Sequence, residues 1–433
     1  MSENIKIEHI GRVEGSGGVT VDIKDGVVQD VKLEIFEGSR FFEFLIVGKS
    51  YDEIPGIVCR ICAICSSSHM LTSLAAIENA FGINVSKQTK LLRELLHCGE
   101  MIESHALHLF CLVAPDHFGF TSVIALAQKY PDIAKMGLSL KKLGNTIQEL
   151  IGGGRPVHPI NTKISGFGKL PSEIELLTIK DGLKKAIDSG LKTVKFFSEL
   201  EVFPIIDAPE HLTALKPEKE KFSFHGESIS ISDGVELKID EYKKLCNEAV
   251  LKQSRAKHTT YKGKPFMVGS LSRLMLFGDM FYGESKEAMN IAKFTKEHTN
   301  PLYNNLAQAV ELVYSIQRSM EIIDEIIKDG IKDEPAPKIK LKKCKGTGAL
   351  EAPRGTLYHH YEFDENGKCV SCDIITPTAI NCANIEKDLK VAAENLLKNK
   401  TEVKEMELKL EMVIRTYDPC ISCAVHMIKI NNL

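Results

Sequence analysis

Residues 58–69 read VCRICAICSSSH, and this stretch decides what kind of fold the chain has to form. It holds cysteines at 59, 62 and 65 and ends on His69. Two residues between cysteines allow both thiolates to reach one ion from a single turn of backbone. Soft thiolates favour zinc, iron–sulfur clusters and other soft or borderline transition metals over magnesium or calcium. The stretch therefore predicts a metal site.

The same spacing returns near the other end of the chain, at Cys420 and Cys423. Joined with Cys62 and Cys65, this pair makes a site of four thiolates closed by opposite ends of the chain. Spacing alone leaves three alternatives: a structural zinc, a ferredoxin-like cluster that also uses Cys59, and a catalytic metal. A ferredoxin-like cluster would need a fourth cysteine and a proline after the motif, which this stretch lacks. A zinc ribbon would not need so long a chain between its halves.

The composition is that of an ordinary soluble protein. The 433 residues are 43% hydrophobic and 26% charged, with a net charge of −3. The weak negative charge gives no basic surface for nucleic acid, and no apolar run of about 18 residues predicts a membrane span. The polar N-terminal residues lack the apolar core of a secretory signal. We therefore expect a cytoplasmic protein whose twelve cysteines are metal ligands, reactive thiols or buried side chains rather than disulfides.

Strands are predicted in three places. Hydrophobic and polar residues alternate over 4–36, with a hairpin turn at Asp25-Gly26. A small β excursion is predicted over 216–242, and a further hairpin leads into Cys369. No G-x-G-x-x-G joins a strand to a helix, so the chain itself is expected to bind no nicotinamide or flavin.

Helical periodicity dominates the rest of the chain. A helix is predicted over 66–81, ended by Gly82, and a longer one over 86–113, stopped by Pro115. A third covers 304–328. Helices this long favour a bundle. We expect an α+β, mostly helical fold, with a core of long helices and small peripheral β-sheets.

Polar motifs are unusually dense along the chain, and several of them contain proline. Because proline fixes φ, a proline beside an arginine or cysteine indicates a rigid backbone around a site. Each motif alone is more often an ordinary turn, but their joint occurrence needs another explanation. They lie at 12–15, 37–43, 154–159, 351–355, 376–378 and 418–420.

Several of these motifs resemble those of one enzyme family. RICAICSSSH at 60–69 resembles the N-terminal cysteine motif of the large, catalytic subunit of the nickel–iron hydrogenases, and DPCISCAVH at 418–426 resembles the C-terminal one. EAPRGTLYHHYE at 351–362 and ITPTAIN at 375–381 are similar to the family's segments beside the iron. The sequence of residues 351–381 is most similar to that of the cytosolic, cofactor-linked group related to heterodisulfide-reductase-associated and deazaflavin-reducing enzymes.

The resemblance implies the hydrogenase large-subunit fold as a single domain over 1–433. Within it we expect an N-terminal β region at about 1–45 and a helical core at about 66–330. A metal-site region at about 340–426 and a tail over 427–433 complete the chain. Family precursors carry such a tail, which a maturation protease removes after nickel insertion, so the tail is either cleaved or retained.

The resemblance also implies the ligand set. Cys62 and Cys420 would be terminal ligands of nickel. Cys65 and Cys423 would bridge nickel to an iron that carries carbon monoxide and cyanide. No iron–sulfur cluster is expected in this chain. The metals would polarise H2 as Lewis acids, and a base would have to take the proton.

Catalytic roles follow from the same resemblance. Glu14 is similar to the family's proton-relay glutamate near the sulfur of Cys420. A buried, low-dielectric place would suit that carboxyl to exchange protons near neutral pH. Arg354 resembles the arginine over the bimetallic site, and Asp418 would pair with it. Because arginine hardly deprotonates, the residue type by itself suggests an electrostatic role, and a base role is only implied.

The remaining implied residues support the centre. His69 would be hydrogen-bonded near a bridging sulfur. Pro353 and Thr378 would line the pocket of the diatomic ligands, with Thr378 donating a hydrogen bond to cyanide. Glu43 and His426 match the family's ligands for magnesium or another hard divalent ion.

The implied activity is reversible oxidation of H2 to protons and electrons. The electrons would leave through an iron–sulfur small subunit. Further flavin or iron–sulfur subunits would select a heterodisulfide reductase, a deazaflavin or a nicotinamide as acceptor. Two alternatives stay open: a structural zinc protein, and a scaffold or quinone-site relative in a respiratory complex. Such relatives lose the cysteine ligands, and all four are present here.

Three features depart from the family or stay outside it. Ala63 stands where the family often has glycine, and Ser16 where a histidine often follows the glutamate motif. Cys59 is not a family ligand. Cys369 and Cys372 have the spacing of a metal pair, but a packed or solvent-facing pair is favoured over a second metal site.

Overall fold

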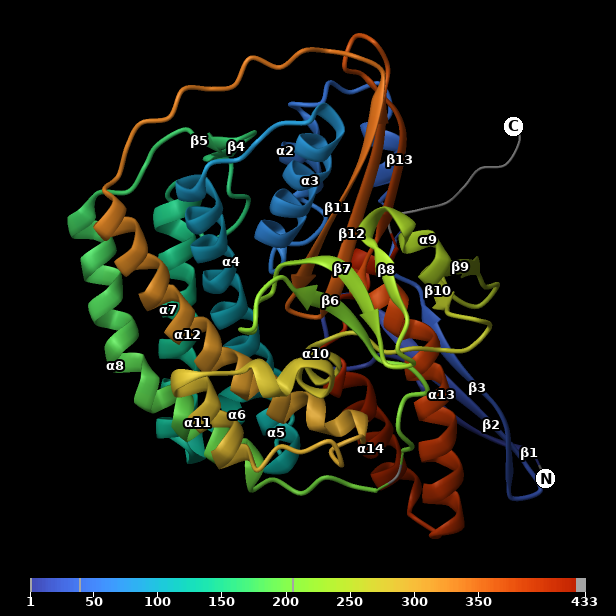
Figure 1. The fold of residues 1–433 in the computed structure, drawn as a ribbon. Coiled ribbons are helices and arrows are strands. Elements are labelled where there is room, and N and C mark those ends of the chain that lie inside the picture. The colour runs from blue at the N-terminus through green and yellow to red at the C-terminus, as the bar shows by residue number, and fades with distance from the viewer. Residues whose placement is uncertain (1, 39, 205, 426–433) are drawn as a thin grey trace.

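Four long helices lie side by side and form one half of the molecule (Figure 1). The computed structural model describes residues 2–38, 40–204 and 206–425. Apolar residues at helical spacing meet between the helices and build the largest hydrophobic cluster. The predicted helix bundle is therefore present. The four helices are α4 (Lys87–Leu107), α7 (Pro131–Gly152), α8 (Glu173–Ser198) and α12 (Asn304–Asp329).

Local signals set the ends of two predicted helices. Helix α3 (Ser66–Phe81) ends at Gly82, whose φ of 67° is a left-handed conformation that glycine adopts without strain. Helix α4 begins after Ser86, whose side chain accepts a hydrogen bond from the N–H of Thr89. Helix α12 begins and ends within one residue of its prediction.

The prediction that Pro115 stops the second helix is wrong. Helix α4 ends at Leu107, and a π-helical turn, η1 (His108–Val113), continues into α5 (Ala114–His117). Pro115 lies in the first turn of α5, where its missing N–H costs no helical hydrogen bond. The wider π turn absorbs the change of hydrogen-bonding pattern before the proline.

The predicted strands form small antiparallel sheets. The N-terminal sheet has the order β1-β2-β3, with its hairpin turn between Lys24 and Val27. The excursion over 216–242 is the sheet β6-β7-β8, and the hairpin before Cys369 joins β12 to β13. The strands are β1 (Ser2–Ile7), β2 (Gly17–Lys24), β3 (Val27–Ile35), β4 (Thr162–Lys163), β5 (Gly166–Phe167), β6 (Thr213–Pro217), β7 (Gly226–Ile231), β8 (Glu236–Lys238), β9 (Asn247–Val250), β10 (Lys257–Thr260), β11 (Cys344–Ala352), β12 (Gly355–Phe363) and β13 (Cys369–Ile375).

Helix α3 lies directly on the sheet β11-β12-β13. A Cβ added at Gly346 would lie 2.3 Å from the carbonyl oxygen of Ala76, and one at Gly348 would lie 2.3 Å from that of Thr72. Only glycine allows the strand backbone to come this close to the helix. The contact fixes α3, which follows the first cysteine pair, against the hairpin that carries residues 351–360.

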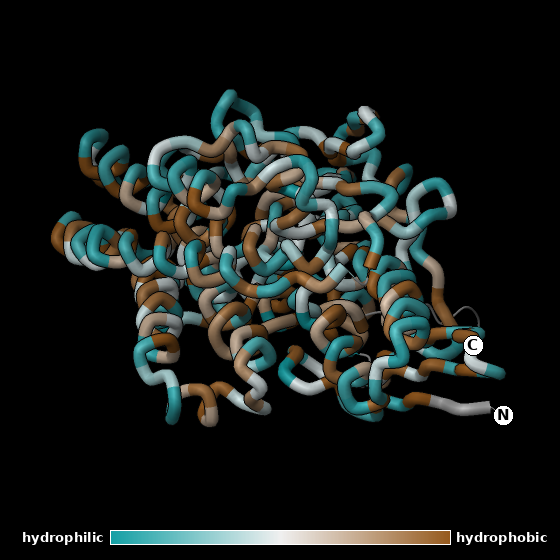
Figure 2. Tube along the Cα trace, turned by 90° about the horizontal axis from the view of Figure 1, so that it is seen from below, coloured by the Kyte–Doolittle hydropathy of each residue, from teal (hydrophilic) through white to brown (hydrophobic). Residues whose placement is uncertain are grey.

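Shorter helices and turns connect these parts. Figure 2 shows hydrophobic and hydrophilic residues mixed along the helices, without long brown runs. Within the described residues, no helix combines the length and apolarity that a membrane crossing requires. The other α-helices are α1 (Phe42–Ile46), α2 (Ile54–Val58), α6 (Val123–Lys129), α9 (Tyr242–Leu245), α10 (Ser270–Phe277), α11 (Gly283–Ala292), α13 (Pro377–Lys398), α14 (Val403–Thr416) and α15 (Ile421–Ala424).

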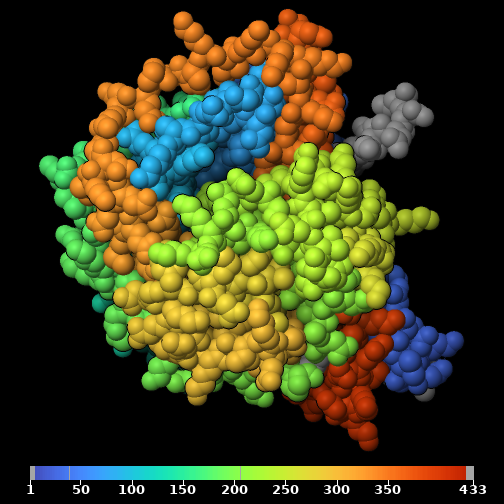
Figure 3. All heavy atoms as spheres, in the orientation of Figure 1, coloured from blue at the N-terminus to red at the C-terminus, as the bar shows by residue number. Residues whose placement is uncertain are grey.

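A broad groove opens on the face shown in Figure 3. It runs between the start of α4, the turn before β7 and the C-terminal half of α12, and Lys90, Phe222 and Arg318 are among its lining residues. None of the four predicted cysteine ligands lines it.

Candidate metal centre

Four cysteine side chains meet at one buried point. The Sγ atoms of Cys62, Cys65, Cys420 and Cys423 all lie within 4.8 Å of one another, and each residue is at most 6% exposed. The sulfurs of Cys62 and Cys420 are 3.3 Å apart, and those of Cys65 and Cys423 are 3.4 Å apart. Thiolates that share a soft metal at about 2.3 Å have separations of this order. The geometry fits a metal centre with sulfur ligands.

One arginine joins the two cysteine segments. Cys62 and Cys65 lie between α2 and α3, and the C-terminal pair flanks the start of α15. The Nη2 of Arg40 donates to the carbonyl oxygen of Ile61 and, at 2.7 Å, to that of Ser422. A single guanidinium group therefore fixes the backbone on both sides of the centre.

The pKa values of the thiols explain why these ligands need a cation. Hydrogen bonds from Cys420 and the other cysteines lower the pKa of Cys62 well below its usual range. Burial raises the pKa of Cys420 and Cys423 well above that range. A buried site cannot hold four negative charges without compensation, and a bound metal ion both deprotonates its thiol ligands and supplies the compensating positive charge. The donor set is that of a soft or borderline metal.

Glu14 contacts the sulfur of Cys420. The two residues form an isolated parallel β-bridge, and the N–H of Ile421 donates to the carbonyl oxygen of Glu14 at 2.9 Å. The Oε2 of Glu14 lies 3.1 Å from the Sγ of Cys420 and accepts the N–H of Ser422 at 3.0 Å. The expectation of a buried carboxyl is wrong, because Glu14 is half-buried in a loop whose neighbour Gly15 is exposed.

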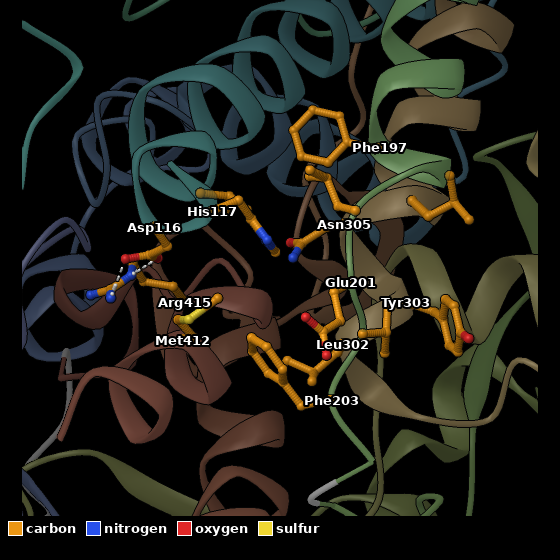
Figure 4. A pocket seen from close by; sticks show the side chains of 14 residues that line it. Asp116, His117, Phe197, Glu201, Phe203, Leu302, Tyr303, Asn305, Met412 and Arg415 are labelled. Carbon is orange, nitrogen blue, oxygen red and sulfur yellow. Dashed lines mark hydrogen bonds and ion pairs between the residues drawn. The ribbon is translucent and has the colours of Figure 1, made fainter. Parts of the chain in front are cut away.

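Ion pairs anchor the loop that carries Glu14. The guanidinium of Arg12 pairs with Asp116, which also binds Arg415 with Nε to Oδ2 at 2.7 Å. Arg415 donates to the carbonyl oxygen of Gly11 at 2.8 Å. Asp116 and Arg415 lie on one side of the small pocket in Figure 4. These contacts join the N-terminal loop to the helix that leads into the C-terminal cysteine pair.

Arg354 and Asp418 form the predicted pair. The Nη2 of Arg354 lies 3.0 Å from the Oδ1 of Asp418, and its Nε donates to the Asp418 carbonyl oxygen at 2.6 Å. Both residues are buried. Asp418 has a φ of 48°, a left-handed conformation that is uncommon for a residue with a side chain. Gln308 donates to its Oδ2 at 3.3 Å. The segment just before Cys420 is therefore held by polar contacts on several sides.

His69 lies beside the sulfur of Cys423. Its Nε2 is 3.7 Å from that sulfur, and its Nδ1 is 3.1 Å from the Nε2 of His359. His359 in turn contacts the hydroxyl of Tyr361, with Nδ1 to Oη at 2.6 Å. His69 and His359 are buried. The second ring therefore fixes the orientation of the first, as outer partners of metal-site residues do.

The similarity of the chain to known proteins covers both cysteine segments. The family model described as nickel-dependent hydrogenase matches residues 40–152 and 217–426. The chain belongs to the nickel-dependent hydrogenase family. It is 41% identical over 427 residues to the alpha chain of sulfhydrogenase 1 of Pyrococcus furiosus, with 98% of each chain covered. It is 34% identical over 424 residues to one subunit of the F420-non-reducing hydrogenase vhu of Methanocaldococcus jannaschii, covering 91% of this chain and 99% of that one.

The fold of this hydrogenase agrees with a solved structure. The crystal structure of an NAD+-reducing nickel–iron hydrogenase in the H2-reduced state matches with a TM-score of 0.88 at 24% identity, over 98% of this chain and 99% of that chain. The predicted large-subunit fold is confirmed. The family match confirms that the chain is the catalytic subunit of a hydrogenase, an oxidoreductase. The structural zinc protein and the quinone-site relative are not favoured.

The other predicted residues of the hydrogenase fall in two places. Pro353 is buried beside Arg354, and Thr378 at the start of α13 accepts the N–H of Cys420 at 3.0 Å. Glu43 is buried in α1, and its Oε1 accepts the N–H of Ile374 at 2.7 Å. His426 and the tail 427–433 lie outside the described residues.

Sequence reasoning missed Arg40 and His359 as residues of the site. Both stand inside motifs that the sequence singles out, at 37–43 and 351–362. The available signals were a charged residue between a small and an aromatic residue, and a pair of adjacent histidines. Their partners are hundreds of positions away, so only the three-dimensional structure identifies what they contact.

The cysteines outside the centre have other surroundings. Cys59 is fully buried and packs with Met70 and Leu74. Cys369 is buried and donates to the carbonyl oxygen of Ser371, while Cys372 is half-buried. Among the residues that the structure describes, the four cysteines of the centre form the only group of three or more side chains placed to hold a metal ion. The alternative of a second metal site at Cys369 and Cys372 has no structural support.

Proposed function

We propose that this hydrogenase subunit catalyses the reversible oxidation of H2 at a nickel–iron centre held by its four central cysteines. Cys62 and Cys420 are its terminal nickel ligands, and Cys65 and Cys423 bridge to an iron that carries carbon monoxide and cyanide. When bound, this centre supplies Lewis-acid activation of H2. The observation that carries the proposal is that four buried thiol groups from both ends of the chain lie within 4.8 Å of one another.

The neighbours of the sulfurs support this division of ligands. The proposed terminal pair carries Glu14 on the sulfur of Cys420, and the proposed bridging pair lies beside His69. A proton acceptor is thus available on one side of the centre. An imidazole that can orient a sulfur is available on the other.

Glu14 moves the proton in this proposal. Its Oε2 is within hydrogen-bond reach of the Cys420 sulfur, which suits direct proton transfer between sulfur and carboxylate. The N–H of Ser422 holds the same oxygen in place. Because Glu14 is half-buried, the proton can pass from the carboxyl group to the outside of this chain.

Arg354 supplies positive charge beside the thiolates. Asp418 holds the guanidinium through Nη2 and Nε, and Nη1 is buried without a hydrogen-bond partner among the described residues. That donor can bind a group at the centre. Thr378 uses its hydroxyl oxygen to accept from Cys420, so its proton remains for a cyanide ligand, and Pro353 lines the same pocket.

Glu43 is the proposed ligand of a hard divalent ion such as magnesium. Its Oε2 is buried without a hydrogen-bond partner among the described residues, and burial raises the pKa of Glu43 to about 8. A divalent ion would satisfy this oxygen and favour the carboxylate. His426 is the proposed second ligand.

The electrons leave through an iron–sulfur small subunit in this proposal. The relatives are named as single subunits of hydrogenases, which supports a multisubunit complex with further flavin or iron–sulfur subunits. Those partners select the acceptor. A cytoplasmic location and removal of the tail 427–433 by a maturation protease belong to the same proposal.

Infrared spectroscopy and metal analysis of the purified complex test the proposal. We expect about one nickel per catalytic subunit, together with absorption bands of metal-bound carbon monoxide and cyanide. Zinc at one per chain, without nickel and without those bands, would overturn it. The exchange of H2 with D2 in the same sample measures H2 activation without any electron acceptor, so a missing acceptor does not obscure the result.

A further inference from the structure

The helix that follows the first cysteine pair has an unusual N-cap residue. Cys65 occupies the N-cap position of α3, and its side chain makes no capping hydrogen bond. The first N–H groups of a helix have no partner within the helix, and a Ser, Thr, Asp or Asn at the N-cap normally supplies one. A cysteine whose sulfur faces a metal centre cannot do so. The N–H groups of Ser67 and Ser68 therefore need another acceptor.

Glu100 of α4 supplies that acceptor. The N–H of Ser67 donates to its Oε1 at 2.7 Å, and the N–H of Ser68 donates to its Oε2 at 3.0 Å. The hydroxyl of Ser68 is bonded to the same Oε2. Glu100 is fully buried. The hydrogen bonds that the structure gives it all go to the first turn of α3.

The surroundings of Glu100 differ from those of two other buried carboxylates, Glu311 and Glu103. Arg273 neutralises Glu311, and Lys141 neutralises Glu103 with Nζ to Oε1 at 2.8 Å. Glu100 forms no such ion pair within the described part of the chain, and burial raises its pKa to about 8. A carboxyl group kept here without a counter-ion is costly, and the bonds that it makes are those of a helix cap.

We propose that Glu100 is a positioning residue of the metal centre, which caps α3 in place of Cys65 and so leaves that sulfur to face the other three. This rests on the proposed ligand role of Cys65. The cap also fixes His69, whose N–H donates to the carbonyl oxygen of Cys65 at 3.1 Å across the same turn. One buried carboxyl group therefore sets a ligand sulfur and the imidazole beside Cys423 together.

The test compares Glu100→Ala, Glu100→Gln and Glu103→Ala in the purified complex. Glu103 is the matched control, because it is a buried carboxylate one turn away on α4 that contacts Lys141 and not the first turn of α3. Hydrogen–deuterium exchange is followed in peptides that cover residues 66–70, with and without bound metal. We expect about tenfold faster exchange in Glu100→Ala, the size of effect that loss of an N-cap produces. Glu100→Gln keeps one acceptor oxygen but turns an amide NH2 toward the other N–H group, so its exchange should lie between that of Glu100→Ala and that of the unmodified protein.

The second measurement is nickel retention during dialysis against a chelator. Loss of an outer partner of a metal ligand typically weakens metal binding about 10- to 100-fold, so Glu100→Ala should lose nickel at least tenfold faster than Glu103→Ala. Equal exchange over 66–70 in these two variants would overturn the proposal. If Glu100→Ala does not fold, Glu100→Asp replaces it, because its shorter side chain cannot reach both N–H groups. Hydrogen–deuterium exchange of the metal-free complex does not depend on hydrogenase activity. The expected difference between the variants is therefore missing only if the cap itself is absent.

Discussion

The two halves of the metal centre are held in different ways. The N-terminal half, Cys62 and Cys65, is fixed by secondary structure, because it leads into α3, which lies on β11 and is capped by a buried carboxyl group. The C-terminal half, Cys420 and Cys423, is fixed by polar side chains from distant segments, namely Glu14, Arg40, Arg354 and Thr378. The comparison shows that one site can combine two kinds of support. One half rests on a packed helix and strand, and the other is held by individual polar contacts, each of which can be removed by one substitution. Substitutions should therefore act differently on the two halves.

The largest loss of activity is expected for the cysteine ligands, because both halves of the centre hold the metals together. Cys62→Ser and Cys420→Ser each remove a thiolate from the centre, and H2 uptake should fall to background in both, more than about 10⁴-fold. Nickel content and H2–D2 exchange measure the loss. Cys59→Ser is the control, since Cys59 is buried outside the centre, and it should keep nickel. Full H2 uptake in Cys420→Ser would refute the ligand assignment.

Glu14→Gln should affect only the C-terminal half. The amide keeps the shape of the side chain but cannot take a proton from Cys420, so activity should fall about 10²- to 10⁴-fold. The metal should remain bound, because Glu14 is not one of the four thiolates. Activity assays and nickel analysis on one preparation check both statements. A variant that loses nickel as well would mean that Glu14 holds the segment rather than the proton.

Asp418→Asn tests the ionic character of the C-terminal half. Removing the carboxylate leaves the buried guanidinium of Arg354 without its counter-ion, which typically costs about 3 to 5 kcal/mol of stability. Urea unfolding should therefore show a clear loss. The matched comparison is Glu100→Gln, which leaves one N–H of the cap in the other half without an acceptor but leaves no buried charge unpaired, and should cost about 1 to 2 kcal/mol. Similar losses in both variants would remove the distinction between the halves.

The smallest effect is a dependence of stability on pH, of at most about 1.4 kcal/mol per pH unit. Burial raises the pKa of Asp388 to about 7, and its carboxyl group accepts the hydroxyl of Tyr417, next to Asp418. The unfolded chain releases this proton near pH 4, so the folded state binds more protons between about pH 4 and 7, and stability falls as pH rises through that window, by roughly 4 kcal/mol at most. Asp388→Asn should flatten the slope. Urea unfolding at three pH values measures it, with the exposed Glu394→Gln on the same helix as control. An unchanged slope in Asp388→Asn would contradict the assignment.

Local chemistry explains which features of the fold could be predicted. Gly82 and Asp25-Gly26 carry their structural preference in their own backbone, and the helix end and the hairpin turn appear at those positions. Pro115 misled the prediction, because the π turn before it depends on packing of η1 against neighbouring helices. The packing of this region therefore overrode the local tendency of proline to end a helix.

The site shows the same limit. The cysteine pairs identify themselves by spacing, and the four sulfurs lie together as predicted from the two motifs. Arg40, His359 and Glu100 carry no such mark, since their roles depend on which distant atoms they contact. The exposure of Glu14 could not be predicted either, because a strand-end glutamate looks the same in a buried and a half-buried loop. The role of a residue that acts through a distant partner can be assigned only when the structure shows that partner.

The β-bridge between Glu14 and Cys420 has a consequence for the synthesis of the protein. A ribosome that adds about 5 to 20 residues per second needs roughly 20 to 70 s to pass from Cys65 to Cys420. During that time the nascent chain offers an incoming metal two thiols instead of four, with Glu14 already made but without the strand partner that positions it. The four-thiolate centre therefore cannot form until Cys423 has been synthesised, and its assembly has to follow that step.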